Sequence, residues 1–257
     1  MRILLASPRD QVDEPVLARA PEVSELVVAK GRESLAAAAE RGVRFDLVVA
    51  DLHWGEHSCC ANSAAKAQFD GFDVLDTVTR ADRGARVLLR TTGAGRHYRE
   101  EASLHPGVVG AVDGPGGDGA LLRAVIGLAN GVAAPKLSPP LSAPLCEHFR
   151  GRHGQTAGRM AVAVAAGLAT DAATLARAAR TAVNTANKVT TSYLGPIIRE
   201  LGECDPELPL TVGAVYRWCG LNADYLLSWG RRNSHRDPSV PRGSAISCRD
   251  SLQFGRN

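Results

Sequence analysis

Asp51 ends an apolar run, FDLVVAD, and a cluster of metal-binding and redox-active residue types follows it at once. This cluster contains His53, His57, Cys59 and Cys60. An acid at the carboxyl end of a parallel strand lies in the crevice where open α/β sheets bind ligands. Imidazoles and thiols this close together could hold Zn²⁺ or respond to oxidation. A solvated loop without a ligand is the alternative, and it is the interpretation we favour.

His53, Glu56 and His57 also match the H-x-x-E-H pattern of one class of zinc proteases. The pattern needs a helix, because a helix puts both histidines on one face. Here the pattern follows a strand and contains Gly55. We therefore predict that the chain is not an enzyme, and we keep metal or redox sensing by this loop as an alternative function.

A second set of functional residue types lies in the other half of the chain. Helical spacing points these side chains outward: Asn184, Thr185, Asn187, Lys188 and Thr191. The same spacing points these inward: Val183, Ala186, Val189 and Tyr193. Short polar groups with one cation suit base edges and phosphates in a DNA major groove. Arg177 and Arg180, just ahead of them, could reach the DNA backbone, although a solvated face that contacts nothing is the alternative.

The residues that position Asp51 form a regular alternation of strands and helices. Short Val- and Leu-rich runs predict five strands, over residues 2–6, 25–29, 45–50, 85–89 and 108–112. Helical patterns lie between several of them, over residues 32–41, 71–80 and 119–130. We also expect a short or irregular helix between the first two strands. This alternation predicts an α/β flavodoxin-like domain with a doubly wound, five-stranded parallel sheet over residues 1–133.

A proline-rich stretch separates the two halves, and its proline density argues against a helix over residues 132–145. We expect a linker over residues 134–150, an all-α domain over 151–232 and a polar tail over 233–257. The predicted helices of the all-α domain cover residues 156–168, 171–180, 183–194, 196–201 and 212–231. Apolar residues of the last helix could pack in the core or form a dimer seam: Val215, Trp218, Leu221, Leu226 and Trp229.

Charge is unevenly distributed between the two halves. The first 135 residues contain 15 Lys+Arg and 18 Asp+Glu, whereas the remaining 122 contain 15 and 9. A basic second half favours a polyanionic partner, because Lys and Arg displace counterions from phosphates. The chain has no apolar run long enough to span a membrane, and its six cysteines are scattered. We therefore expect a cytoplasmic protein without a membrane partner.

The first half resembles the receiver domains of bacterial response regulators. FDLVVADLHWGEH matches the strand that carries the phosphoacceptor, and the segments from Asp70 to Gly93 and from Gly107 to Gly131 match the elements that follow. The resemblance implies that Asp51 is the phosphoacceptor and that Thr91 is the hydroxyl that senses the phosphoryl group. It also implies an acidic pair for Mg²⁺ and a lysine beside the acceptor. Those positions read Ser7-Pro8 and Asp113 instead, so we expect Asp51 to lack normal phosphorylation.

The stretch from Gly158 to Gly202 resembles the helix-turn-helix of the NarL/LuxR family of response regulators. In this resemblance residues 160–168 form the support helix, and Thr170 or Asp171 caps the next helix. Residues 183–193 match the recognition helix. Leu194-Gly195-Pro196 departs from the family, because proline must kink or end the helix there.

These patterns predict a DNA-binding transcription regulator, an atypical response regulator with a degenerate receiver. We expect a homodimer on double-stranded DNA, with RNA polymerase or a small-molecule effector as further possible partners. No cofactor is required, although Mg²⁺ or Zn²⁺ remains possible. A protein-binding adaptor or anti-activator without DNA binding is the other alternative function.

Overall fold

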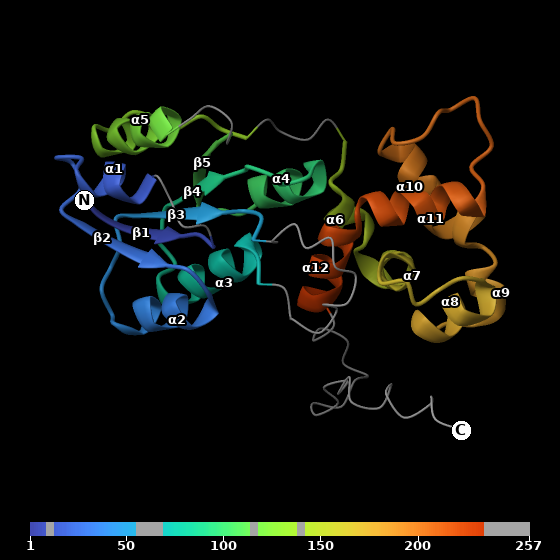
Figure 1. The fold of residues 1–257 in the computed structure, drawn as a ribbon. Helices are drawn as coiled ribbons and strands as arrows, with labels where there is room; N and C mark the ends of the chain where they lie inside the picture. Colours follow the sequence, from blue (N-terminus) through green and yellow to red (C-terminus); the bar gives the residue numbers. More distant parts are fainter. Residues whose placement is uncertain (9–12, 55–68, 114–117, 138–141, 234–257) are drawn as a thin grey trace, which may run out of the picture. The chain divides into compact units, whose positions relative to one another are not determined.

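The computed structural model describes residues 1–8, 13–54, 69–113, 118–137 and 142–233 (Figure 1). Within these residues the chain divides into two compact units, one that ends at His148 and one that begins at Phe149. The first unit mixes strands and helices, and the second is helical. No helix of the described residues is long and apolar enough to cross a bilayer.

The first unit is built on a parallel sheet of five strands in the order β2-β1-β3-β4-β5. The strands are β1 (Arg2–Ala6), β2 (Glu25–Ala29), β3 (Leu47–Asp51), β4 (Val87–Arg90) and β5 (Val108–Val112). This order is the doubly wound, flavodoxin-like one, so the predicted fold class is confirmed. β3 and β4 each begin two residues later than predicted and end one residue later.

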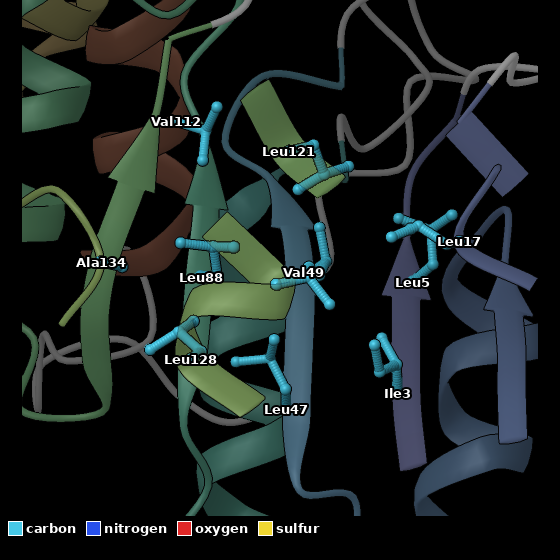
Figure 2. Packing of buried hydrophobic residues seen from close by; sticks show 11 residues of the cluster. Ile3, Leu5, Leu17, Leu47, Val49, Leu88, Val112, Leu121, Leu128 and Ala134 are labelled. Carbon is cyan, nitrogen blue, oxygen red and sulfur yellow. The ribbon is translucent and has the colours of Figure 1, made fainter. Parts of the chain in front are cut away.

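Helices cover both faces of this sheet, which is why its strands are apolar without alternation. α1 (Asp13–Ala18) and α5 (Asp118–Ala129) lie on one face, and α2 (Arg32–Glu40) and α3 (Gly71–Ala81) lie on the other (Figure 1). Figure 2 shows the core beneath α5, where Leu5, Val49 and Leu88 of the central strands meet Leu121 and other apolar side chains.

The helix that follows β4 has no counterpart in the prediction. α4 (Arg96–Ser103) follows β4, and its sequence RHYREEAS is almost entirely polar. Its apolar contacts rest on Tyr98 and Ala102, which are buried at a spacing of one helical turn. Two apolar residues are too few for a periodic signal, so the sequence pattern missed this helix.

Part of the predicted linker packs against the first unit. The Ala111 N–H on β5 donates to the Pro135 carbonyl at 2.7 Å, and Ala134 is buried in the core. A Cβ on Gly110 would overlap Ala134, so glycine permits this close approach. A short helix, α6 (Leu145–His148), begins directly after Pro144, with Leu145 fully buried.

The second unit contains six helices and one wider turn within its described residues. They are α7 (Gly151–Ala165), α8 (Ala172–Ala178), α9 (Val183–Ala186), a π-turn (Val189–Tyr193), α10 (Leu194–Glu200), α11 (Val212–Leu221) and α12 (Ala223–Asn233). α7 lies at the centre and contacts α8, the π-turn, α11 and α12. Gly158 of α7 meets the ring of Trp229, and Gly230 of α12 meets Val162, so small residues allow α7 and α12 to pack closely.

Two predicted helices of this unit are wrong as single elements. The helix predicted over residues 183–194 ends at Ala186, and the chain then widens into the π-turn at Val189-Thr190-Thr191. Three consecutive β-branched residues have lower helix propensity, which explains the break. The helix predicted over residues 212–231 divides at Asn222, whose side chain donates to the Trp218 carbonyl at 3.0 Å.

The apolar residues of this last region mostly pack inside the unit. Val215, Trp218, Leu226 and Trp229 are buried, whereas Leu221 is 80% exposed. Trp229 also meets Phe149 edge-on, with ring centroids 4.8 Å apart. Core packing therefore accounts for four of these five residues.

Candidate functional site

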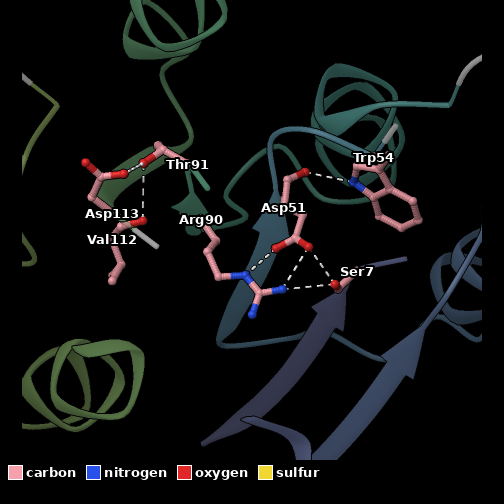
Figure 3. A network of polar contacts seen from close by, with 7 residues as sticks. All are labelled: Ser7, Asp51, Trp54, Arg90, Thr91, Val112 and Asp113. Atoms are coloured by element: carbon pink, nitrogen blue, oxygen red, sulfur yellow. Dashed lines mark hydrogen bonds and ion pairs between the residues drawn. The ribbon is translucent and has the colours of Figure 1, made fainter. Parts of the chain in front are cut away.

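Asp51 and Arg90 occupy matching positions at the ends of adjacent parallel strands. The register pairs Asp51 of β3 directly with Arg90 of β4, so the two side chains leave the sheet side by side. The Arg90 Nε donates to Asp51 Oδ1, and the Arg90 Nη2 donates to Asp51 Oδ2 at 2.8 Å (Figure 3). This bidentate geometry is the strongest way for a guanidinium to bind a carboxylate.

Ser7, which follows β1, completes this buried polar cluster. Its hydroxyl donates to Asp51 Oδ2 at 2.6 Å and accepts from Arg90 Nη2 at 3.0 Å. Asp51 is 4% exposed and Arg90 is 8% exposed, so little water competes with the pair. The Trp54 indole N–H donates to the Asp51 carbonyl at 2.7 Å and fixes the chain after β3. Both carboxylate oxygens of Asp51 are therefore engaged from within the unit.

Thr91 belongs to a different pair. Its hydroxyl lies 3.0 Å from Asp113 Oδ1 and 3.4 Å from the Val112 carbonyl, and its single proton serves one of these acceptors at a time. Figure 3 shows Thr91 on the side of Asp113, apart from the cluster around Asp51. The structure thus brings Asp51 together with Arg90 and Ser7, and brings Thr91 together with Asp113.

The side chains described around Asp51 do not fit Mg²⁺. This ion prefers several oxygen ligands in octahedral geometry, with one or two carboxylates among them. Here Asp51 supplies the carboxylate, and a guanidinium already occupies both of its oxygens. Across the described residues, no three His, Cys, Asp or Glu side chains lie together as a metal-binding group. Asp10, the nearest acid after β1 in the sequence, lies outside them.

The predicted metal-binding cluster is described at one of its four positions. His53 meets the ring of Tyr98 edge-on, with centroids 6.2 Å apart, and Tyr98 stacks on Phe72. His57, Cys59 and Cys60 lie outside the described residues, as does Glu56. Zinc or redox sensing by this loop therefore stays a prediction.

Sequence reasoning missed Arg90 as a site residue. The resemblance to receiver domains implied a lysine after β5, and that position holds Asp113. The cation of this chain comes from β4, one strand closer to Asp51 in the sheet. A usable signal existed, because an acid and a base end two strands that are consecutive in the chain, in FDLVVAD and ARVLLR.

The second candidate site begins at the N-terminus of α8. Asp171 caps this helix, since its Oδ1 accepts from the Ala173 and Thr174 N–H groups at 2.8 and 2.9 Å. Thr174 Oγ1 in turn accepts from the Asp171 N–H at 3.1 Å, which completes a capping box. These bonds, that from Thr174 foremost, lower the pKa of Asp171. Of the two predicted caps, Asp171 is therefore the one that caps the helix.

A short turn joins α8 to α9, and Arg180 lies in it with a positive φ of 53°. Among the non-glycine residues described, it alone has a left-handed backbone. That conformation brings Cβ too close to a backbone oxygen and costs about 1–2 kcal/mol. The Arg180 N–H donates to the Arg177 carbonyl at 3.3 Å and the Thr181 N–H to the Ala176 carbonyl at 2.8 Å, so the left-handed residue ends α8 in a Schellman motif. Glycine is the usual residue at that position, and arginine adds an exposed cation to the turn.

Most of the predicted polar set faces solvent. The exposed members are Arg177, Arg180, Asn184, Asn187, Lys188 and Thr191, and Thr185 is half-buried. Ala186 and Val189 are buried as predicted, and Tyr193 is half-buried. Val183 was predicted to face inward, and this is wrong because it is 47% exposed at the first position of α9. α11 contacts the π-turn, yet the set stays exposed beside it.

This exposed set has a strongly positive local charge. From Ala172 to Arg199 the chain contains four cations and no Asp or Glu. The four are Arg177, Arg180, Lys188 and Arg199, and each is exposed. A solvated helix face of ordinary composition mixes both signs, so a segment of one sign favours an anionic partner.

Comparisons with known proteins gave matches among solved structures alone: no protein-family model matches the chain, and no curated protein does. A LuxR-family two-component response regulator from an Aurantimonas species is 22% identical, with a TM-score of 0.40, over 57% of this chain and 96% of that one. The response regulator RcsB in complex with DNA is 14% identical, with a TM-score of 0.49, over 85% of this chain and 98% of that one.

RcsB from Salmonella typhimurium is also 14% identical, with a TM-score of 0.48, over the same shares of the two chains. Identities this low concern the fold alone, and a shared fold does not establish a shared function. The function is therefore inferred from the side chains of this chain and their surroundings.

Proposed function

We propose that this chain is a DNA-binding transcription regulator whose helical unit holds double-stranded DNA. The observation that carries the proposal is the exposed, acid-free segment from Arg177 to Thr191. Its amides and hydroxyls can donate to and accept from base edges, and its cations can contact phosphates. In this proposal α8, the turn and α9 form the helix-turn-helix, with Asn184, Asn187 and Lys188 entering the major groove.

The first unit is proposed as an input domain that does not use phosphorylation of Asp51. Phosphoryl transfer to Asp51 needs a free carboxylate oxygen, and both oxygens are bound to Arg90 and Ser7. A phosphoryl group also needs cations around it, but Arg90 is already bound to the Asp51 carboxylate, and Asp113 supplies a carboxylate near Thr91. In this proposal the input is a partner or effector that binds one conformation of the first unit more tightly than another.

Selection from a random duplex library tests DNA binding. Purified full-length protein is incubated with the library, and bound duplexes are amplified and sequenced over several rounds. The proposal expects enrichment of one motif, arranged as two related half-sites about one helical turn apart if the protein acts as a dimer. Weak binding without any enriched motif would favour the protein-binding adaptor instead.

Acetyl phosphate labelling tests the input domain. We expect the wild-type chain to remain unlabelled at Asp51. We expect Asp51→Ala to change the affinity for the selected duplex by less than about twofold, because Asp51 belongs to the first unit and the change leaves every cation of the helical unit in place. The readouts are intact-mass spectrometry and fluorescence anisotropy. Labelling of Asp51 together with a change in DNA affinity would show that phosphorylation is the input after all.

A further inference from the structure

α7 carries three polar side chains at successive turns, at His153, Thr156 and Arg159. Their spacing of three residues places them along one stripe of the helix. α7 contacts both α8 and the π-turn, the two elements that hold the ends of the exposed segment from Arg177 to Thr191. Two members of the stripe donate hydrogen bonds to backbone carbonyls of these elements.

Arg159 binds the end of α8. Its Nε donates to the Ala179 carbonyl at 3.0 Å, and its Nη2 donates to Thr156 Oγ1 at 3.2 Å. Ala179 is the last residue before Arg180, where the backbone becomes left-handed. Carbonyls at a helix C-terminus lack partners within the helix and carry partial negative charge, so a guanidinium there is favourable.

His153 binds the other end of the segment. Its Nε2 donates to the Ser192 carbonyl at 2.7 Å, and its ring stacks on Tyr193 with centroids 4.3 Å apart and planes 15° apart. In a regular α-helix the Ser192 carbonyl would accept from the backbone N–H four residues later. That residue is Pro196, which has no N–H, so the carbonyl is left for His153.

Gly195 and Pro196 shape the backbone that presents the Ser192 carbonyl to His153. A Cβ on Gly195 would overlap the Thr190 carbonyl oxygen, so the wide turn of backbone requires glycine at this position. Gly195 and Pro196 thus allow a π-turn in which the Ser192 carbonyl, next to the last of the turn, faces His153 of α7. Insertions of this kind in helices occur frequently at functional sites.

We propose that His153 and Arg159 are positioning residues that set the orientation of the segment from Arg180 to Thr191 on DNA. The proposal rests on the DNA-binding function proposed above. The segment is not one continuous helix, so its own backbone bonds do not fix the direction of its side chains from end to end. Two bonds from one helix, at Ala179 and at Ser192, replace that internal rigidity. Neither donor needs to touch DNA.

His153 offers a pair of matched variants in the full-length chain. His153→Phe keeps an aromatic ring that can stack on Tyr193 and removes the donor, whereas His153→Gln keeps a donor of similar reach and removes the ring. Each variant and the wild type are titrated with two probes: the duplex enriched from the random library, and a scrambled duplex of the same length and composition. The quantity compared is the ratio of the two dissociation constants.

We expect His153→Phe to lower this specificity ratio about three- to tenfold, the range produced by losing one hydrogen bond. Its affinity for the scrambled duplex should stay within about twofold of wild type, since phosphate contacts tolerate small misorientation. His153→Gln should keep the wild-type ratio within about twofold, because the donor is retained. Hydrogen exchange without DNA should show faster exchange over residues 189–195 in His153→Phe.

Two results would overturn the positioning role. One is a wild-type specificity ratio in His153→Phe, and the other is an equal loss of affinity for both duplexes, as a generally weakened unit would give. If the wild type binds neither duplex, the proposed function fails and the positioning role fails with it. If the wild type discriminates between them and His153→Phe does so equally well, the positioning role alone fails.

Discussion

At the scale of single residues, burial decides what Asp51 can do. Asp51 and Arg90 are almost removed from water, so each charge is stable in the sheet because the other is present. A carboxylate at the end of β3 would be a ready nucleophile if it were open to solvent. Here Arg90 of β4 and Ser7 bind both of its oxygens, so the carboxylate is a structural partner of β4.

Removing one member of this pair should destabilise the first unit more than removing both. Asp51→Asn leaves a buried guanidinium without its counter-charge, and we expect the free energy of unfolding to fall by about 3 kcal/mol. Asp51→Asn with Arg90→Met should recover at least half of that loss. Urea unfolding of the four chains of this double-mutant cycle measures the coupling. Single variants within about 0.5 kcal/mol of wild type would refute the pairing as a source of stability.

Arg180 should show opposite effects on stability and on DNA binding. Arg180→Gly relieves the left-handed strain, and we expect unfolding to require up to about 1 kcal/mol more. The same change removes a cation, so DNA affinity should fall. The slope of log affinity against log salt concentration should become shallower by about one. Thermal unfolding and anisotropy titrations measure the two effects. A variant that is more stable and binds DNA as well as wild type would leave the strain at Arg180 without a functional reason.

At the scale of elements, α8 depends on its first turn. This seven-residue helix is too short to form alone, and the Asp171 capping box supplies partners for its free N–H groups. Because the bonds from Thr174 and Ala173 favour the ionised carboxylate, the pKa of Asp171 is lower in the folded chain than in the unfolded one. The cap therefore contributes fully above the ordinary pKa of 3.8, and its contribution is lost as the pH falls through the native value.

Asp171→Asn separates the cap from its charge. Asparagine caps helices about as well as aspartate but does not titrate, so part of the acid sensitivity should disappear. Melting temperatures of the two chains are compared from neutral pH to about pH 3, where we expect the smaller decrease in the variant. An identical decrease in both chains would mean that Asp171 does not contribute to the acid response.

The sequence predicted the elements of the sheet better than those of the helical unit. Strands covered on both faces must be apolar throughout, and β1 and β3 follow that rule closely. The helix predicted over residues 183–194 failed because periodicity does not reveal where a backbone widens. The side chains predicted to face outward are nevertheless mostly exposed, because Ala186 and Val189 are buried on the two sides of the break.

At the scale of the whole molecule, the two units differ in how far their sites could be predicted. The exposed polar segment follows from residue type and spacing along one stretch of chain, which sequence displays directly. The Asp51–Arg90 pair depends on the register between two strands whose paired residues lie 39 apart in the sequence. The same register places Thr91 one residue beyond Arg90, away from Asp51. Long-range register is a property of the folded sheet, so the sequence motif placed the expected cation on the wrong strand.

The uneven charge of the chain agrees with the proposed binding of DNA by the helical unit. Acidic residues outnumber basic ones in the first 135 residues, and the order is reversed in the rest. Nonspecific repulsion of the first unit by DNA and attraction of the second would orient the protein before any specific contact forms. The proposed function therefore requires that the cations of the helical unit contact the DNA phosphates.

Lys188 and Lys136 provide the most direct measurement of that claim, because both are exposed and Lys136 lies outside the helical unit. The affinity of wild type, Lys188→Ala and Lys136→Ala for one duplex is measured across a range of salt concentrations. We expect a steep fall in wild-type affinity with salt, a slope shallower by about one in Lys188→Ala, and a wild-type slope in Lys136→Ala. Equal slopes in all three chains, or an affinity that does not respond to salt, would contradict DNA binding by the helical unit.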